Sequence, residues 1–243
     1  MLALVGLGIN FDPTLNGIKT AKECDEVFLE KYTSPIPTDI QKELKKLIKK
    51  DIRVIDREEV EGNFIVEKAE NKKICLFIMG DPLVATTHIS LLAECRKRNI
   101  ETKIVHNSSI LTAVARTGLQ AYKFGRTVTI AKWSANYKPT SPLLFIEKNL
   151  SIGLHTLVLL DVQPEPMDAK EGIEQLFEME KVEKKKIIKD VVVLSRLGFG
   201  DEKITYGRAE KLLKKDLGKP PFSLIVPAGL HPAEEEYLKF FEV

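Results

Sequence analysis

The chain has 243 residues, enough for one large domain or two small ones with a buried core. A hydrophobic content of 44% and a charged content of 30% are typical of a soluble globular protein. The net charge of +2 is too small to indicate a nucleic-acid-binding protein, and 29 lysines against 8 arginines favour a solvated surface over a phosphate-binding one.

The sequence also argues against secretion and membrane insertion. The apolar start, MLALVGLGIN, is short and lacks basic residues, so it predicts a first strand and not a signal peptide. No apolar run approaches the ~20 residues that a membrane helix needs. Three cysteines without metal-ligand spacing, Cys24, Cys75 and Cys95, are interpreted as buried, reduced thiols. We therefore expect a cytoplasmic protein.

Strands alternate with helices in the first half of the chain. In order, the hydrophobic pattern predicts a strand at 2–7, a helix at 14–24, a strand at 25–30, a helix at 39–50, a strand at 52–55, a helix near 57–70, a strand at 73–79, a helix at 85–98 and a strand at 101–106. Strands that are apolar almost throughout are buried on both faces, which predicts a mostly parallel sheet between layers of helices.

The helix at 39–50 is basic on one side. Thr38 and Gln41 predict a capping box at its start. Its lysines lie mainly off the apolar face, so we expect a solvated surface without a role in binding nucleic acid. These lysines are Lys42, Lys45, Lys46, Lys49 and Lys50.

The second half of the chain has its own set of strands. The predicted elements are a strand at 125–131, a helix at 141–149, a strand at 155–161, a helix at 169–181, a strand at 190–196, a helix at 207–217, a strand at 222–227 and a helix at 233–241. We divide the chain into an N-terminal α/β domain, 1–112, and a C-terminal α/β domain, 113–243.

Gly6 and Gly8 follow the first strand, as in a dinucleotide-binding fingerprint. The third glycine of that fingerprint would stand at position 11, which is Phe11, and no acidic residue ends a second strand convincingly; Glu30 is the nearest candidate. A nicotinamide site is therefore disfavoured. The two glycines still allow either a ligand to approach the backbone or a plain tight turn.

The stretch GDPLVATTH follows the strand at 73–79 and places a lone carboxylate, Asp81, at the break between strand and helix. Asp81 is either an N-cap residue or part of an exposed ligand-binding loop. Thr86 and Thr87 offer a second cap position further on, which favours the loop. In an open α/β sheet, ligands bind at the carboxyl ends of the strands, where the loop and Gly6–Ile9 both belong.

A third junction, HNSSILTAVARTGL at 106–119, places Ser108 and Ser109 at a helix start, so three junctions converge on one predicted cleft. Capping alone would also explain the two serines. His106 ends a strand and His155 begins one, and each is interpreted first as a hydrogen-bonded structural residue. No metal site is expected, and the chain lacks a nucleophile elbow and a P-loop.

Five motifs together resemble a known family. VGLG, GDPLVATTH, NSSI, LHTLVLLD and LIVPAGLHPAEEEYL are similar to those of the diphthine synthases, in the tetrapyrrole-methylase-like class of S-adenosylmethionine-dependent methyltransferases. The resemblance runs from residue 2 to about 240. It implies two α/β domains with mostly parallel or mixed sheets, the cofactor in the cleft between them, and a homodimer.

The resemblance also implies the residues that bind S-adenosylmethionine, with S-adenosylhomocysteine as the product. They come from three junctions of the first half and three of the second. By position, the implied cofactor contacts are Ile9, Asp81, Val84, Ser109, Ile110, Leu160, Leu197 and Phe222. No catalytic residue is assigned; if a general base exists, His231 and Asp161 are weak candidates.

The reaction that the resemblance implies is methylation of the amino nitrogen of an aminocarboxypropyl group on one histidine of translation elongation factor 2. The factor is then a protein substrate, and no direct contact with nucleic acid is expected. Two alternatives stay open at this point. One is a methyltransferase of the same architecture that acts on a small molecule or RNA, and the other is a non-catalytic ligand-binding α/β module.

Overall fold

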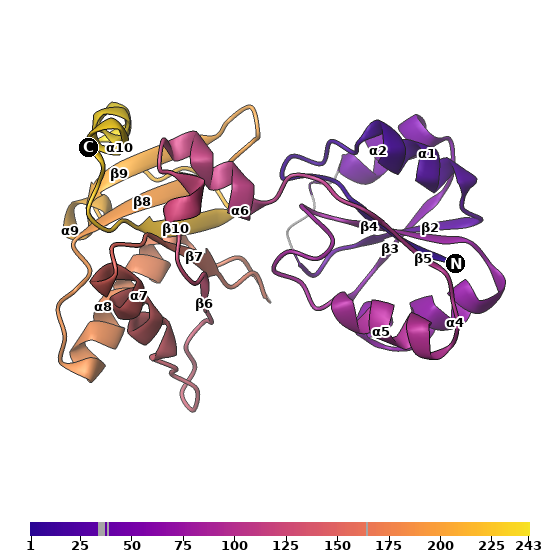
Figure 1. The fold of residues 1–243 in the computed structure, drawn as a ribbon, viewed down its shortest axis with the longest axis horizontal. Coiled ribbons are helices and arrows are strands. Elements are labelled where there is room, and N and C mark those ends of the chain that lie inside the picture. The colour runs from indigo at the N-terminus through magenta and orange to yellow at the C-terminus, as the bar shows by residue number, and fades with distance from the viewer. Residues whose placement is uncertain (34–36, 38, 164) are drawn as a thin grey trace. The chain divides into compact units, whose positions relative to one another are not determined.

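The computed structural model describes residues 1–33, 37, 39–163 and 165–243 (Figure 1). These residues cluster into two compact units, Met1–Ile110 and Leu111–Val243. Each unit contains one five-stranded sheet with helices, which confirms the predicted α/β class. Within the described ranges, no helix is both long and apolar enough to cross a membrane.

The first unit contains a parallel sheet with the strand order β3-β2-β4-β1-β5. Its strands are β1 (Leu2–Gly6), β2 (Glu26–Glu30), β3 (Ile52–Ile55), β4 (Ile74–Ile78) and β5 (Thr102–Val105). Its helices are α1 (Leu15–Glu23), α2 (Ile40–Ile48), α3 (Arg57–Glu61), α4 (Phe64–Asn71) and α5 (Ile89–Lys97). Figure 1 shows α1 and α2 on one face of the sheet and α4 and α5 on the other. All residues of β1 and β4 are buried, as expected for strands covered on both faces.

The helix predicted near 57–70 is two helices, because Gly62 ends α3 in an extended conformation and α4 begins at Phe64 after its N-cap Asn63. The capping box predicted at Thr38 lies outside the described residues. Most lysines of α2 are exposed, but the Lys50 ammonium donates hydrogen bonds to the carbonyls of Lys22 and Cys24. Lys50, which is half-buried just after α2, therefore ties the end of that helix to the end of α1.

The second unit contains a mixed sheet with the order β6-β7-β10-β8-β9. β6 and β7 pair in parallel; β10 is antiparallel to β7 and β8, and β8 is antiparallel to β9. The strands are β6 (Val128–Ile130), β7 (Thr156–Leu160), β8 (Asp190–Ser195), β9 (Lys203–Arg208) and β10 (Phe222–Val226). The helices are α6 (Ile110–Ala113), η1 (Val114–Thr117), η2 (Ala121–Lys123), α7 (Ser141–Ser151), α8 (Ala169–Glu183), α9 (Ala209–Leu212), α10 (Pro232–Leu238) and η3 (Lys239–Phe241).

Two elements of the second unit differ from the prediction. The edge strand β9 was not predicted, and it pairs with β8 from Asp190↔Arg208 to Ser195↔Lys203. The helix predicted at 207–217 is only the four-residue α9, because the start of that stretch belongs to β9. The helix start expected after Ser109 is the short α6 followed by η1, and η2 was missed, since it is too short to show an apolar period.

A buried ionic cluster ties α10 to the sheet of the second unit. The Glu234 side chain is 1% exposed, its Oε2 lies 2.6 Å from the Lys123 ammonium, and its Oε1 lies 3.1 Å from Nε2 of the fully buried His155. The backbone N–H groups of Gln120 and His231 also donate to the Glu234 carboxylate. Burial opposes ionisation of Glu234, but these hydrogen bonds outweigh it and lower its pKa to about 2.

Candidate functional site

Three loops of the first unit meet at one edge of its sheet. They are Gly6–Ile9, Gly80–Val84 and His106–Ile110, which follow the adjacent parallel strands β1, β4 and β5. The N–H of Gly8 donates to the Gly80 carbonyl at 3.1 Å, and the N–H of Gly80 donates back at 2.9 Å. The N–H of Ile9 donates to Oγ of Ser108 at 3.3 Å. We call these residues the three-loop cluster.

Asp81 holds the three-loop cluster together and does not cap a helix. The helix after it, α5, begins only at Ile89. The carboxylate is nearly buried and accepts hydrogen bonds from the N–H of Leu83 at 3.0 Å and of Asn107 at 3.3 Å. Its Oδ2 also lies 2.7 Å from Nδ1 of His106. The N-cap interpretation of Asp81 was therefore wrong, and Asp81–Val84 is a loop.

Asn107 belongs to the cluster and was not singled out from the sequence. Its amide nitrogen donates to the carbonyls of Gly6 and Asp12, both at 3.0 Å, and its Oδ1 accepts from the N–H of Ser108 at 2.8 Å. One side chain thus links the loops after β1 and β5. The available signal was an amide residue directly after a strand, where such side chains commonly bond to the backbone of a turn.

Of the glycines in the three-loop cluster, Gly6 has the least room for a side chain. A Cβ there would lie 2.6 Å from the Gly80 carbonyl oxygen. We expect Gly6→Ala to push the loops after β1 and β4 apart and to lower the free energy of unfolding by about 1–3 kcal/mol. Gly200→Ala is the control, since no atom lies within 4 Å of its Cβ position. Urea unfolding of both variants tests this, and equal stability would contradict it.

The other predicted site residues of the first unit lie in the same three loops. Ile9, Val84 and Ile110 are half-buried and apolar, and Ser109 is 5% exposed. Beside Gly80 the space is open, because the nearest atom to a Cβ there would be the Ser108 carbonyl oxygen at 3.8 Å. This edge of the sheet therefore combines apolar side chains, open space beside Gly80 and the Asp81 carboxylate.

The predicted site residues of the second unit gather at one end of its sheet. Leu160 ends β7, Leu197 follows β8 closely, and Phe222 begins β10, which runs in the opposite direction. Leu160 and Phe222 belong to the hydrophobic core, where Leu160 packs against Gly172 of α8. The side chains of Leu160 and Phe222 are thus mostly engaged in packing. These two residues could therefore contact a ligand mainly through their backbone groups.

Both candidates for a general base already have structural partners. The Asp161 carboxylate accepts from the N–H of Lys132 at 3.2 Å and of Gln163 at 3.1 Å. His231 is the N-cap of α10, where its Nδ1 accepts from the N–H of Ala233 at 3.3 Å. Among the described residues, no group of three or more His, Cys, Asp and Glu side chains could hold a metal ion.

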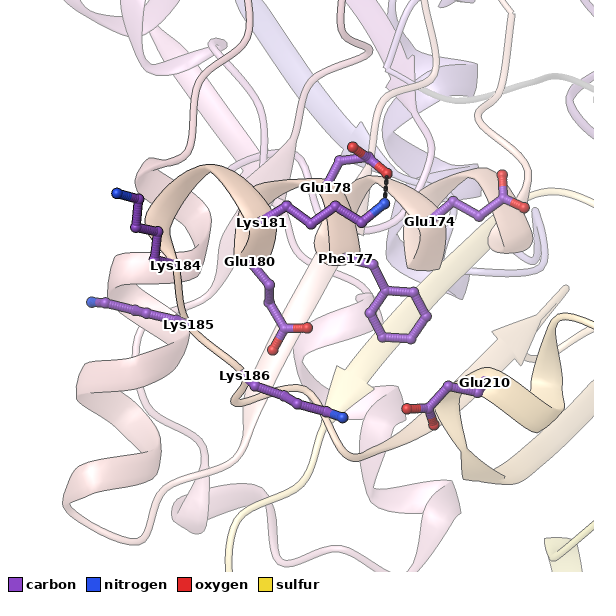
Figure 2. A pocket seen from close by; sticks show the side chains of 9 residues that line it. All are labelled: Glu174, Phe177, Glu178, Glu180, Lys181, Lys184, Lys185, Lys186 and Glu210. Carbon is purple, nitrogen blue, oxygen red and sulfur yellow. Dashed lines mark hydrogen bonds and ion pairs between the residues drawn. The ribbon is translucent and has the colours of Figure 1, made fainter.

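A separate cavity of about 700 Å³ lies beside the C-terminal half of α8 (Figure 2). Figure 2 shows charged side chains of both signs around Phe177. Several are partnered: Lys181 pairs with Glu178, Lys185 pairs with Glu147, and Glu180 accepts from backbone N–H groups. The lining carries charges of both signs and no one sign dominates, so the cavity gives no specific indication of a ligand.

Comparison with known proteins agrees with this fold. Residues 1–213 match the family model described as "Tetrapyrrole (Corrin/Porphyrin) Methylases". Two curated relatives called diphthine synthase, from Methanococcus vannielii and Methanocaldococcus jannaschii, are each 39% identical over 99% of this chain and 98% of their own. A crystal structure of diphthine synthase superposes with a TM-score of 0.90 at 34% identity, covering 99% of this chain and 95% of that one.

The match over residues 1–213 and the superposition show that this two-unit α/β fold is that of a tetrapyrrole methylase. Within that class, the chain belongs to the diphthine synthase family of methyltransferases, as its full-length similarity to the relatives shows.

Proposed function

We propose that the chain binds S-adenosylmethionine at the three-loop cluster. The observation that carries this proposal is the Asp81 loop, a nearly buried carboxylate beside open space at Gly80. A carboxylate stabilises a nearby sulfonium or ammonium cation and accepts hydrogen bonds from ribose hydroxyls. Ile9, Val84 and Ile110 offer apolar contacts to a nucleoside, and Ser109 completes the set. Leu160, Leu197 and Phe222 are the contacts that we propose from the second unit.

The substrate that we propose is the aminocarboxypropyl-histidine of translation elongation factor 2. S-Adenosylmethionine, when bound, supplies an electrophilic methyl group, and in-line attack by the amine depends mainly on positioning. An α-amino group has a pKa of about 8, so a neutral amine is accessible without a strong base. Structural partners for Asp161 and His231 are consistent with a site that needs no dedicated base.

Methylation of the factor tests this proposal directly. We expect successive methyl increments in the intact mass of elongation factor 2 that carries the aminocarboxypropyl group, and none on the unmodified factor. Fragmentation should place every increment on the modified histidine. Methyl groups on lysines, on RNA or on a tetrapyrrole, with the modified factor unchanged, would favour a different substrate for the same fold.

A further inference from the structure

A chain of hydrogen bonds lies next to the Asp81 loop and connects it with the end of β2. Tyr32 follows β2 and is 9% exposed. Its hydroxyl lies 3.2 Å from Nε2 of His88 and 3.1 Å from Oγ1 of Thr87. The other ring nitrogen of His88, Nδ1, lies 3.1 Å from the carbonyl oxygen of Pro82, the residue after Asp81. His88 is 1% exposed, so water does not compete for these contacts.

The Pro82 carbonyl fixes which group donates and which accepts in each of these hydrogen bonds. A carbonyl only accepts, so Nδ1 of His88 carries a proton and donates to Pro82. Burial lowers the pKa of His88, which favours the neutral ring. Nε2 of a neutral ring with a protonated Nδ1 is an acceptor, and the Tyr32 hydroxyl therefore donates to it. With its one proton donated to His88, the Tyr32 hydroxyl can only accept from Thr87, whose own hydroxyl also lies 3.2 Å from Oε1 of Glu61.

A buried carboxylate anchors the backbone at the Tyr32 end of this series of hydrogen bonds. Glu30, the last residue of β2, is 2% exposed and accepts from the N–H of Tyr32 at 2.9 Å and of Thr33 at 3.1 Å. The hydroxyl of Thr33 also donates to it. The backbone that carries Tyr32 is thus anchored, and the Tyr32 ring meets the His88 ring edge-on at 5.9 Å.

The loop after Asp81 needs such contacts. Ala85 has φ 56, a left-handed conformation that alanine rarely adopts, and no regular helix forms before Ile89. The Pro82 carbonyl accepts from both the Thr86 hydroxyl and His88, so these bonds fix the first turn of the loop. A strained loop keeps one conformation only when surrounding groups restrain it.

We propose that Tyr32 and His88 are positioning residues for the methyl-donor site, because His88 holds the Pro82 carbonyl, Tyr32 holds His88, and together they keep the Asp81 loop in its ligand-binding form. This inference rests on the proposed function. Neither side chain contacts the reacting atoms; each acts through the loop.

Tyr32→Phe removes the hydroxyl and keeps the ring. We expect S-adenosylmethionine to bind about threefold to tenfold more weakly to this variant in calorimetry, the equivalent of one hydrogen bond. Thr20→Val is the matched control, since Thr20 is buried in the same unit and its hydroxyl donates to the Asn16 carbonyl in α1. We expect Thr20→Val to lose stability in urea unfolding but to bind with unchanged affinity.

The His88 variants separate positioning from packing. His88→Asn offers an amide donor to the Pro82 carbonyl and should bind more tightly than His88→Ala. In the His88→Asn background, Tyr32→Phe should cost less affinity than in the wild type, because its partner nitrogen is already gone.

The outcomes are distinct. If the wild-type protein does not bind S-adenosylmethionine, the proposed function fails and this inference fails with it. If the wild type binds and Tyr32→Phe binds equally well, only the positioning role is overturned. A matching affinity loss in Thr20→Val would also overturn it, because the effect would then be general destabilisation.

Discussion

Asp81→Ala is expected to weaken S-adenosylmethionine binding by about tenfold to a hundredfold, the range for a lost hydrogen bond or ion pair to a charged group. The variant should also lose about 1–3 kcal/mol of unfolding free energy, because the N–H groups of Leu83 and Asn107 lose their acceptor. Calorimetric titration and urea unfolding on the same sample measure the two effects.

Asp81→Asn separates the two roles of this residue. The amide keeps the size of the side chain and one oxygen that can accept from Leu83, but it removes the negative charge. We expect only part of the stability to return, because the amide NH2 then faces the N–H of Asn107, while the affinity stays low. An Asp81→Ala protein that is destabilised but binds the cofactor normally would show that the carboxylate only organises the loops.

Glu234→Gln is expected to cause the largest loss of stability, about 3–5 kcal/mol, because it leaves the Lys123 ammonium without its buried anion. The amide also presents a donor among the N–H groups of Gln120 and His231. Glu235→Gln is the control: Glu235 forms an exposed pair with Lys239, and such pairs contribute little. Equal urea midpoints for the two variants would contradict the prediction.

The same cluster makes the stability of the second unit depend on pH. The pKa of Glu234 falls from 4.5 to about 2 on folding, so its contribution of roughly 3 kcal/mol is complete above pH 4.5 and is lost as the pH falls towards 2. Burial lowers the pKa of His155, so protonation of that ring in the unfolded chain also favours unfolding below neutral pH. Unfolding at a series of pH values should therefore show a shallower acid limb for Glu234→Gln than for the wild type.

The sequence predicted the regular strands and long helices well, because their apolar patterns reflect burial that the fold then provides. It missed β9, since KITYGR contains a glycine and becomes a strand only by pairing with β8. It placed the start of α5 too early, because Thr86 and His88 bond to the Pro82 carbonyl in a turn that local propensity does not reveal. Tertiary contacts decided both cases.

The three junctions of the first unit were also predictable, because the carboxyl ends of neighbouring parallel strands meet at one edge. What the sequence could not show was the partners of Asp81. His106 and Asn107 lie 25 and 26 positions further along the chain, and only the pairing of β1 with both β4 and β5 brings them beside the carboxylate. The bond between Tyr32 and His88 likewise depends on β2 lying next to β4.

The strand order also has a consequence for how the chain folds during synthesis. β1 leaves the ribosome first, yet both of its partners, β4 at Ile74–Ile78 and β5 at Thr102–Val105, come much later in the chain. Such non-local pairing slows folding, because a long loop must close before the contacts form. Until β4 emerges, the apolar segment Leu2–Gly6 has no strand beside it, so a nascent or truncated chain that ends before Ile74 exposes a sequence prone to aggregation.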